Sequence, residues 1–245
     1  MLDLVAAIEH CDLPEAALLI TGWWGNPAIS ARPLELTVTK KIESMPPLSF
    51  RLRGVDLRHP YLRGRGISSA TASEFGVGLY SGPGLMSQRL VIPIHDEAGR
   101  LVGYVGRSLD GSEPRYKFPA GFAKSKLLFN LHRAAAIGER AVIVVEGFFD
   151  CLKVYQAGFR SVVALMGCAL YERQQWLLAQ RFREIILMLD GDTAGRRAAA
   201  SIAAKLSSDC SVRTVELAGN TQPDQLSEQF LRELLAQKGG PQQKR

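Results

Sequence analysis

The sequence predicts an α/β protein (α+β overall), in which a parallel sheet flanked by helices follows a basic α+β subdomain and a short N-terminal helical segment. Three observations predict this fold. After Gly138, apolar β-branched runs alternate with helical segments of about 9–14 residues, which is typical of a parallel sheet covered by helices. Before it, two strand-like runs flank a short turn. The chain's surplus of positive charge lies in that same earlier region.

Residues 1–46 are expected to form a helical segment and a linker. Leu19, Ile20 and Trp23 recur at helical spacing. Asp12 can cap this helix. The pattern from Asn26 onward is irregular and contains prolines, which is typical of a linker.

Residues 47–137 are expected to form the basic subdomain. Residues 47–136 contain 13 basic and 6 acidic residues, and most of the basic ones are arginine. Arginine forks match phosphate geometry, so this block favours a nucleic acid or nucleotide partner over a merely solvated surface. Residues 89–95 and 101–107 are predicted to form a hairpin. Pro93 suggests that the first of these strands lies at a sheet edge.

Residues 138–218 are expected to form the parallel sheet with its helices, and residues 219–245 a C-terminal helix and a disordered tail. Right-handed crossovers should connect the strands. The predicted strands are residues 141–145, 162–165, 184–189 and 211–217. The predicted helices are residues 149–157, 171–181 and 193–206.

Acidic residues follow two of these strands directly. Glu146 follows the first strand, and Asp190 and Asp192 follow the third. Ligands of such sheets bind beyond the carboxyl ends of the strands, so these acids should converge there. Clustered carboxylates at an open edge suit Mg²⁺. In the alternative reading, Asp190 or Asp192 only caps the helix that starts at Thr193, and Glu146 is an exposed loop acid.

Composition excludes several classes of protein. No apolar run approaches the roughly 18–20 residues that a membrane helix needs. The four cysteines are scattered without a C-x-x-C pair, which argues against a disulfide framework and a cysteine zinc site. We expect a cytoplasmic protein that has no membrane partner and no zinc. The cysteines are Cys11, Cys151, Cys168 and Cys210.

Several motifs carry a family resemblance. The acidic motifs, Glu146-Gly-Phe-Phe-Asp150 and Asp190-Gly-Asp-Thr-Ala-Gly-Arg-Arg197, resemble the Toprim domain of bacterial primases, topoisomerases and some nucleases. The preceding motifs resemble the DnaG-type primase core, without its N-terminal zinc module or its C-terminal helicase-binding domain. They include Tyr61-Leu-Arg-Gly-Arg-Gly-Ile-Ser68 and Phe122-Ala-Lys-Ser-Lys-Leu-Leu-Phe-Asn130. Residues 1–46 resemble the tail of the primase zinc-binding domain.

The resemblance implies roles for individual residues. Glu146, Asp190 and Asp192 would be catalytic, with Glu146 as a metal-linked acid or base. The same three acids and Asp150 would bind Mg²⁺ or Mn²⁺. The chain departs from the family pattern at Gln222-Pro-Asp224, where the family has Asp-Pro-Asp. The residues expected to bind nucleic acid or nucleotide are Arg89, Arg100, Arg107, Arg115, Lys124 and Lys126.

The resemblance further implies RNA primer synthesis on single-stranded DNA by metal-dependent nucleotidyl transfer, as in DNA replication. Single-stranded DNA and ribonucleoside triphosphates would be the partners, together with a replicative helicase or a separate zinc-bearing subunit. Two other functions stay open from the sequence. One is a Toprim nuclease, in which the same acids activate water. The other is a non-catalytic single-strand-binding accessory protein.

Overall fold

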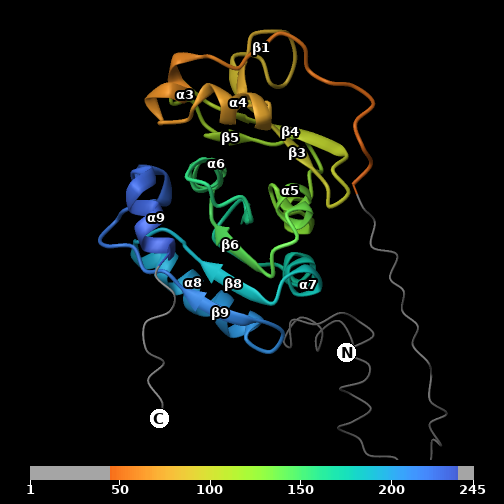
Figure 1. Ribbon diagram of the computed structural model, residues 1–245. Helices are drawn as coiled ribbons and strands as arrows, with labels where there is room; N and C mark the ends of the chain where they lie inside the picture. The colour runs from red at the N-terminus through yellow and green to blue at the C-terminus, as the bar shows by residue number, and fades with distance from the viewer. Residues whose placement is uncertain (1–44, 237–245) are drawn as a thin grey trace, which may run out of the picture. The chain divides into compact units, whose positions relative to one another are not determined.

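The molecule contains two β-sheets, one antiparallel and one parallel (Figure 1). The structure is a computed structural model, and it describes residues 45–236. The predicted N-terminal helical segment and most of its linker lie outside the described residues, as does the predicted tail from Gly239 onward. The domain boundaries expected from the sequence therefore stay predictions, although the two sheets divide between Lys117 and Ala141.

The first sheet is antiparallel and follows strand order β1-β2-β3-β4-β5. The predicted hairpin forms its centre, because the turn Asp96–Gly99 lets β3 and β4 pair over six residues. Asp96 is buried in this turn and accepts the backbone N–H groups of Ala98 and Arg100. The strands are β1 (Val55–Asp56), β2 (Gly78–Tyr80), β3 (Arg89–His95), β4 (Leu101–Arg107) and β5 (Tyr116–Lys117).

The edge position expected from Pro93 is wrong for its strand, because β3 lies between β2 and β4. The structure gives the reason that a proline is accepted there. The last residue of β3 that pairs with β2 is Val91, opposite Gly78. Pro93 therefore has a strand neighbour on one side only, opposite Tyr104 of β4.

Two short helices lie between β1 and β2 in the chain, and two further short helices follow β5. Ser68 caps α4, and its side chain accepts the N–H of Thr71. The helix ends at Gly76, which adopts a positive φ of 66°. These elements are α3 (Pro60–Gly64), α4 (Ser69–Phe75), the 3₁₀ helix η1 (Lys124–Lys126) and α5 (Leu131–Ala136).

The second sheet is parallel, as predicted, and follows strand order β7-β6-β8-β9. Strand β6 has the predicted bounds, whereas β7, β8 and β9 end one, two and three residues earlier than expected. Single hydrogen bonds from Met188 and Val215 continue the pairing beyond β8 and β9. Its strands are β6 (Ala141–Val145), β7 (Val162–Ala164), β8 (Glu184–Leu187) and β9 (Ser211–Thr214). Its helices are α6 (Phe148–Gln156), α7 (Glu172–Arg181), α8 (Thr193–Leu206), η2 (Pro223–Gln225) and α9 (Glu228–Ala236).

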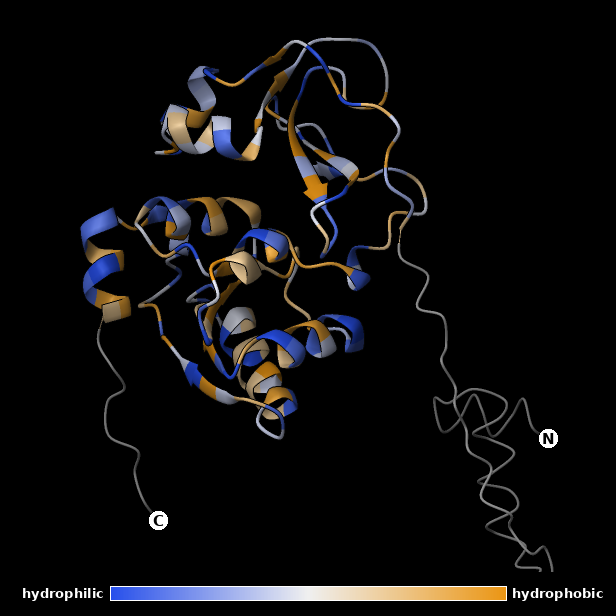
Figure 2. Cartoon of the chain, turned by 45° about the vertical axis from the view of Figure 1, so that its right-hand side comes forward, coloured by the Kyte–Doolittle hydropathy of each residue, from blue (hydrophilic) through white to orange (hydrophobic). Residues whose placement is uncertain are grey.

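Each face of the parallel sheet packs into a different core. Ile143 and Val145 face a core that also contains buried residues of α6, α9, β3 and β4, so one continuous core joins the two sheets. Val142 and Val144 face a second core, made with α5, α7 and α8. Hydrophilic and hydrophobic residues alternate along the covering helices in Figure 2, as expected for helices that bury one face.

The helices of residues 45–236 are all too short or too polar to cross a membrane.

Candidate active site

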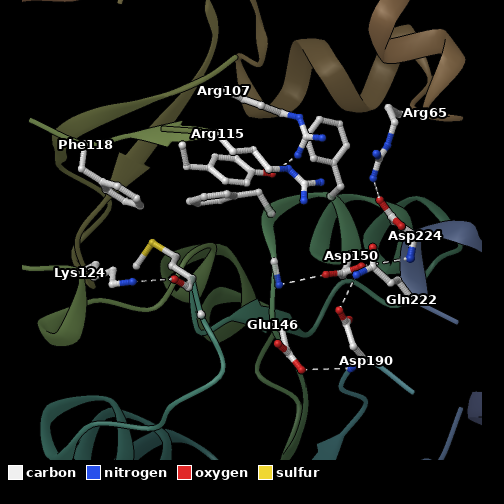
Figure 3. Close-up of a pocket in the computed structure, with 16 residues that line it drawn as sticks. Arg65, Arg107, Arg115, Phe118, Lys124, Glu146, Asp150, Asp190, Gln222 and Asp224 are labelled. Atoms are coloured by element: carbon white, nitrogen blue, oxygen red, sulfur yellow. Dashed lines mark hydrogen bonds and ion pairs between the residues drawn. The ribbon is translucent and has the colours of Figure 1, made fainter. Parts of the chain in front are cut away.

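A pocket of about 300 Å³ lies between the two sheets (Figure 3). One wall comes from the antiparallel sheet, the end of α3 and the segment that follows the sheet, and the other from the carboxyl ends of the parallel strands, the first turn of α6 and η2. The first wall is cationic and aromatic, and the second is acidic. The charged lining residues are Arg65, Arg107, Arg115, Lys124, Glu146, Asp150, Asp190 and Asp224.

Glu146 and Asp190 lie together because β6 and β8 are neighbours in the sheet. Each residue follows the last buried residues of its strand, so the parallel pairing brings both to the same edge. The backbone N–H of Asp190 donates to Glu146 Oε1 over 3.2 Å. The structure thus brings together two of the three acids that the sequence places at this edge.

Position 191 has room only for glycine, because neighbouring backbone lies too close for a side chain. A Cβ at this position would lie 2.7 Å from the carbonyl oxygens of Leu217 and Gly219. The sequence suggests a sharp turn at Gly147 and Gly191, but neither residue has a positive φ. The close approach of a neighbouring backbone is the physical reason for Gly191.

Asp192 does not line this pocket. It caps α8, where its Oδ1 accepts the N–H of Gly195 over 2.7 Å. This is the capping role that the alternative reading gave it. Asp192 still lies near enough to influence the charges of Glu146 and Asp190.

Asp150 and Asp224 form a second acidic pair, deeper in the wall. Asp150 lies in the first turn of α6, where its Oδ2 accepts the N–H of Gly147. Its Oδ1 accepts the N–H of Asp224, which anchors η2 to α6. Asp224 is in turn ion-paired with Arg65, which comes from the end of α3. This ion pair joins the two walls of the pocket.

Arg107 is the most firmly held cation of the opposite wall. Its guanidinium donates to the hydroxyls of Tyr61 and Tyr116 over 2.7 and 2.5 Å. It also lies over the ring of Phe149, with the guanidinium carbon 5.1 Å from the ring centroid. Only 6% of Arg107 is exposed, so its charge is fixed in place at the pocket wall.

Arg115 and Lys124 also line the pocket, as the sequence predicts for binding residues. Arg115 is exposed, and its guanidinium lies near the ring of Tyr116. Lys124 Nζ donates to the carbonyl of Met166 over 3.4 Å, and Met166 has a positive φ of 62°. The phenyl ring of Phe118 lies beside this lysine (Figure 3).

Three predicted basic residues are not part of this pocket. Arg89 donates to the carbonyls of Gly106 and Pro114, which ties strands and loop together. Arg100 is ion-paired with the buried Asp96 in the hairpin turn. Lys126 ends η1 outside the pocket lining.

Three carboxyl groups of the pocket, those of Glu146, Asp150 and Asp190, have raised pKa values. Burial, reinforced by the charges of Asp190 and Asp192, raises the pKa of Glu146. Burial also raises the pKa of Asp190, with added repulsion from Asp192 and Asp224. For Asp150, burial and the charges of Asp224 and Asp190 raise the pKa to about 7. A cation bound between such groups would favour their ionised forms.

Glu146 and Asp190 are the residues best able to hold such a cation. The Oδ1 atom of Asp190 is buried and has no hydrogen-bond partner. Within residues 45–236, no three His, Cys, Asp or Glu side chains form a group that could hold a metal. Two carboxylates nevertheless fit Mg²⁺, because it keeps several waters and takes further ligands from substrate phosphates.

Known families match the two parts of the chain that form the walls of the pocket. Residues 84–135 match the N-terminal domain of the DNA primase catalytic core. Residues 143–227 match the Toprim-like family. The first match contains Arg107 and Lys124, and the second contains all four acids of the pocket.

Bacterial DNA primases are similar in sequence. The DNA primase of Aquifex aeolicus is 33% identical over 243 residues, which are 94% of this chain and 47% of the relative. That of Synechococcus elongatus is 48% identical over 119 residues, or 45% of this chain and 17% of the relative. The chain thus spans about half, or less, of the length of these curated relatives.

Solved primase structures are similar in fold. A structure of the zinc-binding and RNA polymerase domains of Aquifex aeolicus primase has a TM-score of 0.66 at 28% identity, covering 97% of this chain and 70% of that one. The RNA polymerase domain of Mycobacterium tuberculosis primase DnaG gives 0.64 at 26% identity, covering 74% and 75%. The chain has a DnaG-type primase core. The α/β fold expected from the sequence is confirmed with it.

The lining residues of the primase core for which the sequence predicts no role include Arg65 and Gln222. Arg65 lies within the quoted motif at residues 61–68, but no role was expected of it. Gln222 was noted only as a missing acid, yet its Nε2 donates to Asp190 Oδ2 over 2.6 Å. The roles of all the lining residues stay predictions, because these comparisons match families and folds rather than individual side chains.

Proposed function

We propose that this primase core synthesises short RNA primers on single-stranded DNA by metal-dependent nucleotidyl transfer. The observation that carries the proposal is the pocket itself, in which acidic side chains with raised pKa values face a cationic wall. In the proposed reaction, a 3′-hydroxyl attacks the α-phosphorus of a ribonucleoside triphosphate, and pyrophosphate leaves. A partner, either a replicative helicase or a separate zinc-bearing subunit, is part of the proposal.

The two walls have separate tasks in this proposal. Arg107, Arg115 and Lys124 bind the phosphates of nucleotide and template, whose charges they oppose. Glu146 and Asp190 hold Mg²⁺ or Mn²⁺. Such a cation, when bound, stabilises the charge on the attacking and leaving oxygens.

Template binding should be nearly independent of sequence. A cationic wall recognises the sugar–phosphate backbone, and an aromatic ring can stack on any base. Tyr116 and Phe118 are the aromatic residues that line this wall. A solved DnaG primase catalytic domain of similar fold is bound to single-stranded DNA, which supports DNA as the partner of this chain.

The test is incorporation of labelled ribonucleotides on single-stranded DNA with Mg²⁺ or Mn²⁺, for the chain alone and with candidate helicase or zinc-bearing partners. Asp190→Ala should abolish synthesis and leave DNA binding largely intact. Full synthesis by this variant contradicts the proposal. Template cleavage without synthesis favours a nuclease. DNA binding with neither reaction, under every condition, favours the non-catalytic accessory role.

A further inference from the structure

The four carboxylates of the pocket differ in how many oxygens remain available. Both oxygens of Asp150 accept backbone N–H groups, from Gly147 and Asp224. The charge of Asp224 is neutralised by Arg65, although its Oδ1 atom, like that of Asp190, is buried without a hydrogen-bond partner. Glu146 and Asp190 have no cationic partner of this kind, and each uses one oxygen in a hydrogen bond. Two negative charges therefore remain uncompensated by direct ion pairs at the edge of the sheet.

Gln222 determines how one of these two carboxylates is oriented. Its Nε2 donates to Asp190 Oδ2, and Asp190 Oδ1 is left buried without a partner. Figure 3 shows the two side chains pointing toward one another across the pocket floor. The backbone of Gln222 is held in place, because this residue is the N-cap of η2, its N–H donates to Gln225 Oε1, and η2 is anchored by the bond between Asp224 and Asp150.

The chemical identity of residue 222 has a second effect. An amide contributes no charge, and its N–H group occupies an oxygen that could otherwise ligate a cation. A carboxylate in its place would stand beside Asp190 and add the charge needed for another divalent cation. Gln222 thus reduces both the number of free ligand oxygens and the negative charge of the pocket.

We propose that Gln222 is a positioning residue that orients Asp190 and limits the free protein to one tightly bound divalent cation. A second cation then binds only together with a nucleoside triphosphate, whose phosphates supply the missing oxygens. This inference rests on the metal dependence in the proposed function, and it goes further by assigning the number of cations and the residue that sets it.

Mn²⁺ binding measured by electron paramagnetic resonance tests the inference without any need for synthesis. The wild-type chain should bind one Mn²⁺ tightly, and two when a non-hydrolysable ribonucleoside triphosphate is added. Gln222→Asp should bind two without the nucleotide. The matched control is Gln229→Asp, which makes the same change of charge on an exposed position of α9. This control should still bind one.

A second variant keeps the test decisive if Gln222→Asp does not fold. Gln222→Ala retains neutrality, so it should still bind one Mn²⁺. It frees Asp190 Oδ2 but loses the bond that orients this carboxylate, and we expect the loss of orientation to dominate, with binding about fivefold weaker, as expected for one hydrogen bond. Two tight ions in the nucleotide-free wild type, one ion in a folded Gln222→Asp variant, or unchanged affinity in Gln222→Ala would each overturn the inference.

The inference and the proposed function fail in different experiments. Two tight ions in a wild-type chain that makes primers would overturn the inference alone. One tight ion in a chain that makes no primers with any partner would overturn the proposed function alone.

Discussion

The two walls of the pocket differ in whether their charges are stabilised before a ligand binds. On the antiparallel wall, Arg107 is held by two tyrosine hydroxyls and an aromatic ring, so its charge is fixed before any ligand arrives. On the parallel wall, burial and mutual repulsion raise the pKa values of Glu146 and Asp190. The first wall is ready to bind phosphate, whereas the second is completed by an added cation. We therefore expect the walls to separate binding from turnover.

The largest expected effect tests this separation directly. Glu146→Gln keeps the size of the side chain but removes a negative charge from the metal-binding edge. Primer synthesis should fall on the order of 10³-fold, as when a group that stabilises a transition state is lost. Single-stranded DNA affinity, measured by fluorescence anisotropy, should change less than about twofold. An equal loss of primer synthesis and of DNA affinity would contradict the separation of turnover and binding between the two walls.

The next largest effect concerns the ion pair that joins the walls. Arg65→Ala leaves the carboxylate of Asp224, whose side chain is only 3% exposed, without its partner. The free energy of unfolding should fall by about 2 kcal/mol, less than for a fully buried pair, because Arg65 is partly exposed. Urea denaturation measures this loss.

A double variant provides the control for this pair. Adding Asp224→Asn to Arg65→Ala removes the unpaired charge, so most of the lost stability should return. If the double variant were as unstable as Arg65→Ala, the loss would come from packing instead of charge.

The acidic wall should also make stability depend on pH. The pKa of Asp150 is raised from its ordinary value of 3.8 to about 7 in the folded state. Between about pH 4 and pH 7, the folded chain keeps a proton that the unfolded chain releases, so stability falls as pH rises. Below this range the contribution vanishes, and above it the loss is complete.

Asp150→Asn should flatten the pH dependence over that window. A difference of one full proton between the folded and unfolded chains changes the free energy of unfolding by about 1.4 kcal/mol per pH unit. The wild-type slope should be a fraction of this value. Urea midpoints across the range, measured in chelator so that no metal binds, would reveal the difference in slope. Identical slopes in both proteins would contradict the raised pKa of this carboxyl group.

The smallest effect distinguishes cations inside the pocket from those outside it. Arg115→Ala should weaken single-stranded DNA binding about threefold and lower the salt slope by about 0.7, as expected for one lost phosphate contact. Arg100→Ala removes a cation that is ion-paired in the hairpin turn, and should change neither quantity. Salt titrations of both variants measure this contrast, and equal slopes would contradict it.

The sequence predicts what depends on local pattern. Residues 193–206 form the predicted helix because Asp192 caps it and apolar residues recur on one side. Glu146 and Asp190 could be placed at one edge because parallel strands all end on the same side of their sheet. The edge position predicted from Pro93 was wrong, because a strand can be central in its sheet while one of its residues has a neighbouring strand on one side only.

What the sequence could not predict depends on contacts between distant residues. Arg65 and Asp224 are 159 residues apart, and nothing local to either indicates their pairing. Charge alone also did not reveal which arginines face a ligand. Arg89 was expected to bind nucleic acid, yet its guanidinium bonds to two backbone carbonyls. Side-chain direction is fixed by packing, which composition does not encode.

The continuous core that joins the two sheets has a further consequence. Helix α6 contributes pocket residues from its first turn, and its remaining buried residues belong to the core shared with β3, β4 and α9. The opposing walls are thus built on a common support of buried apolar residues. Discrimination between correct and incorrect nucleotides should then come from motion of the template and primer strands through a rigid cleft, more than from a hinge that closes around each one.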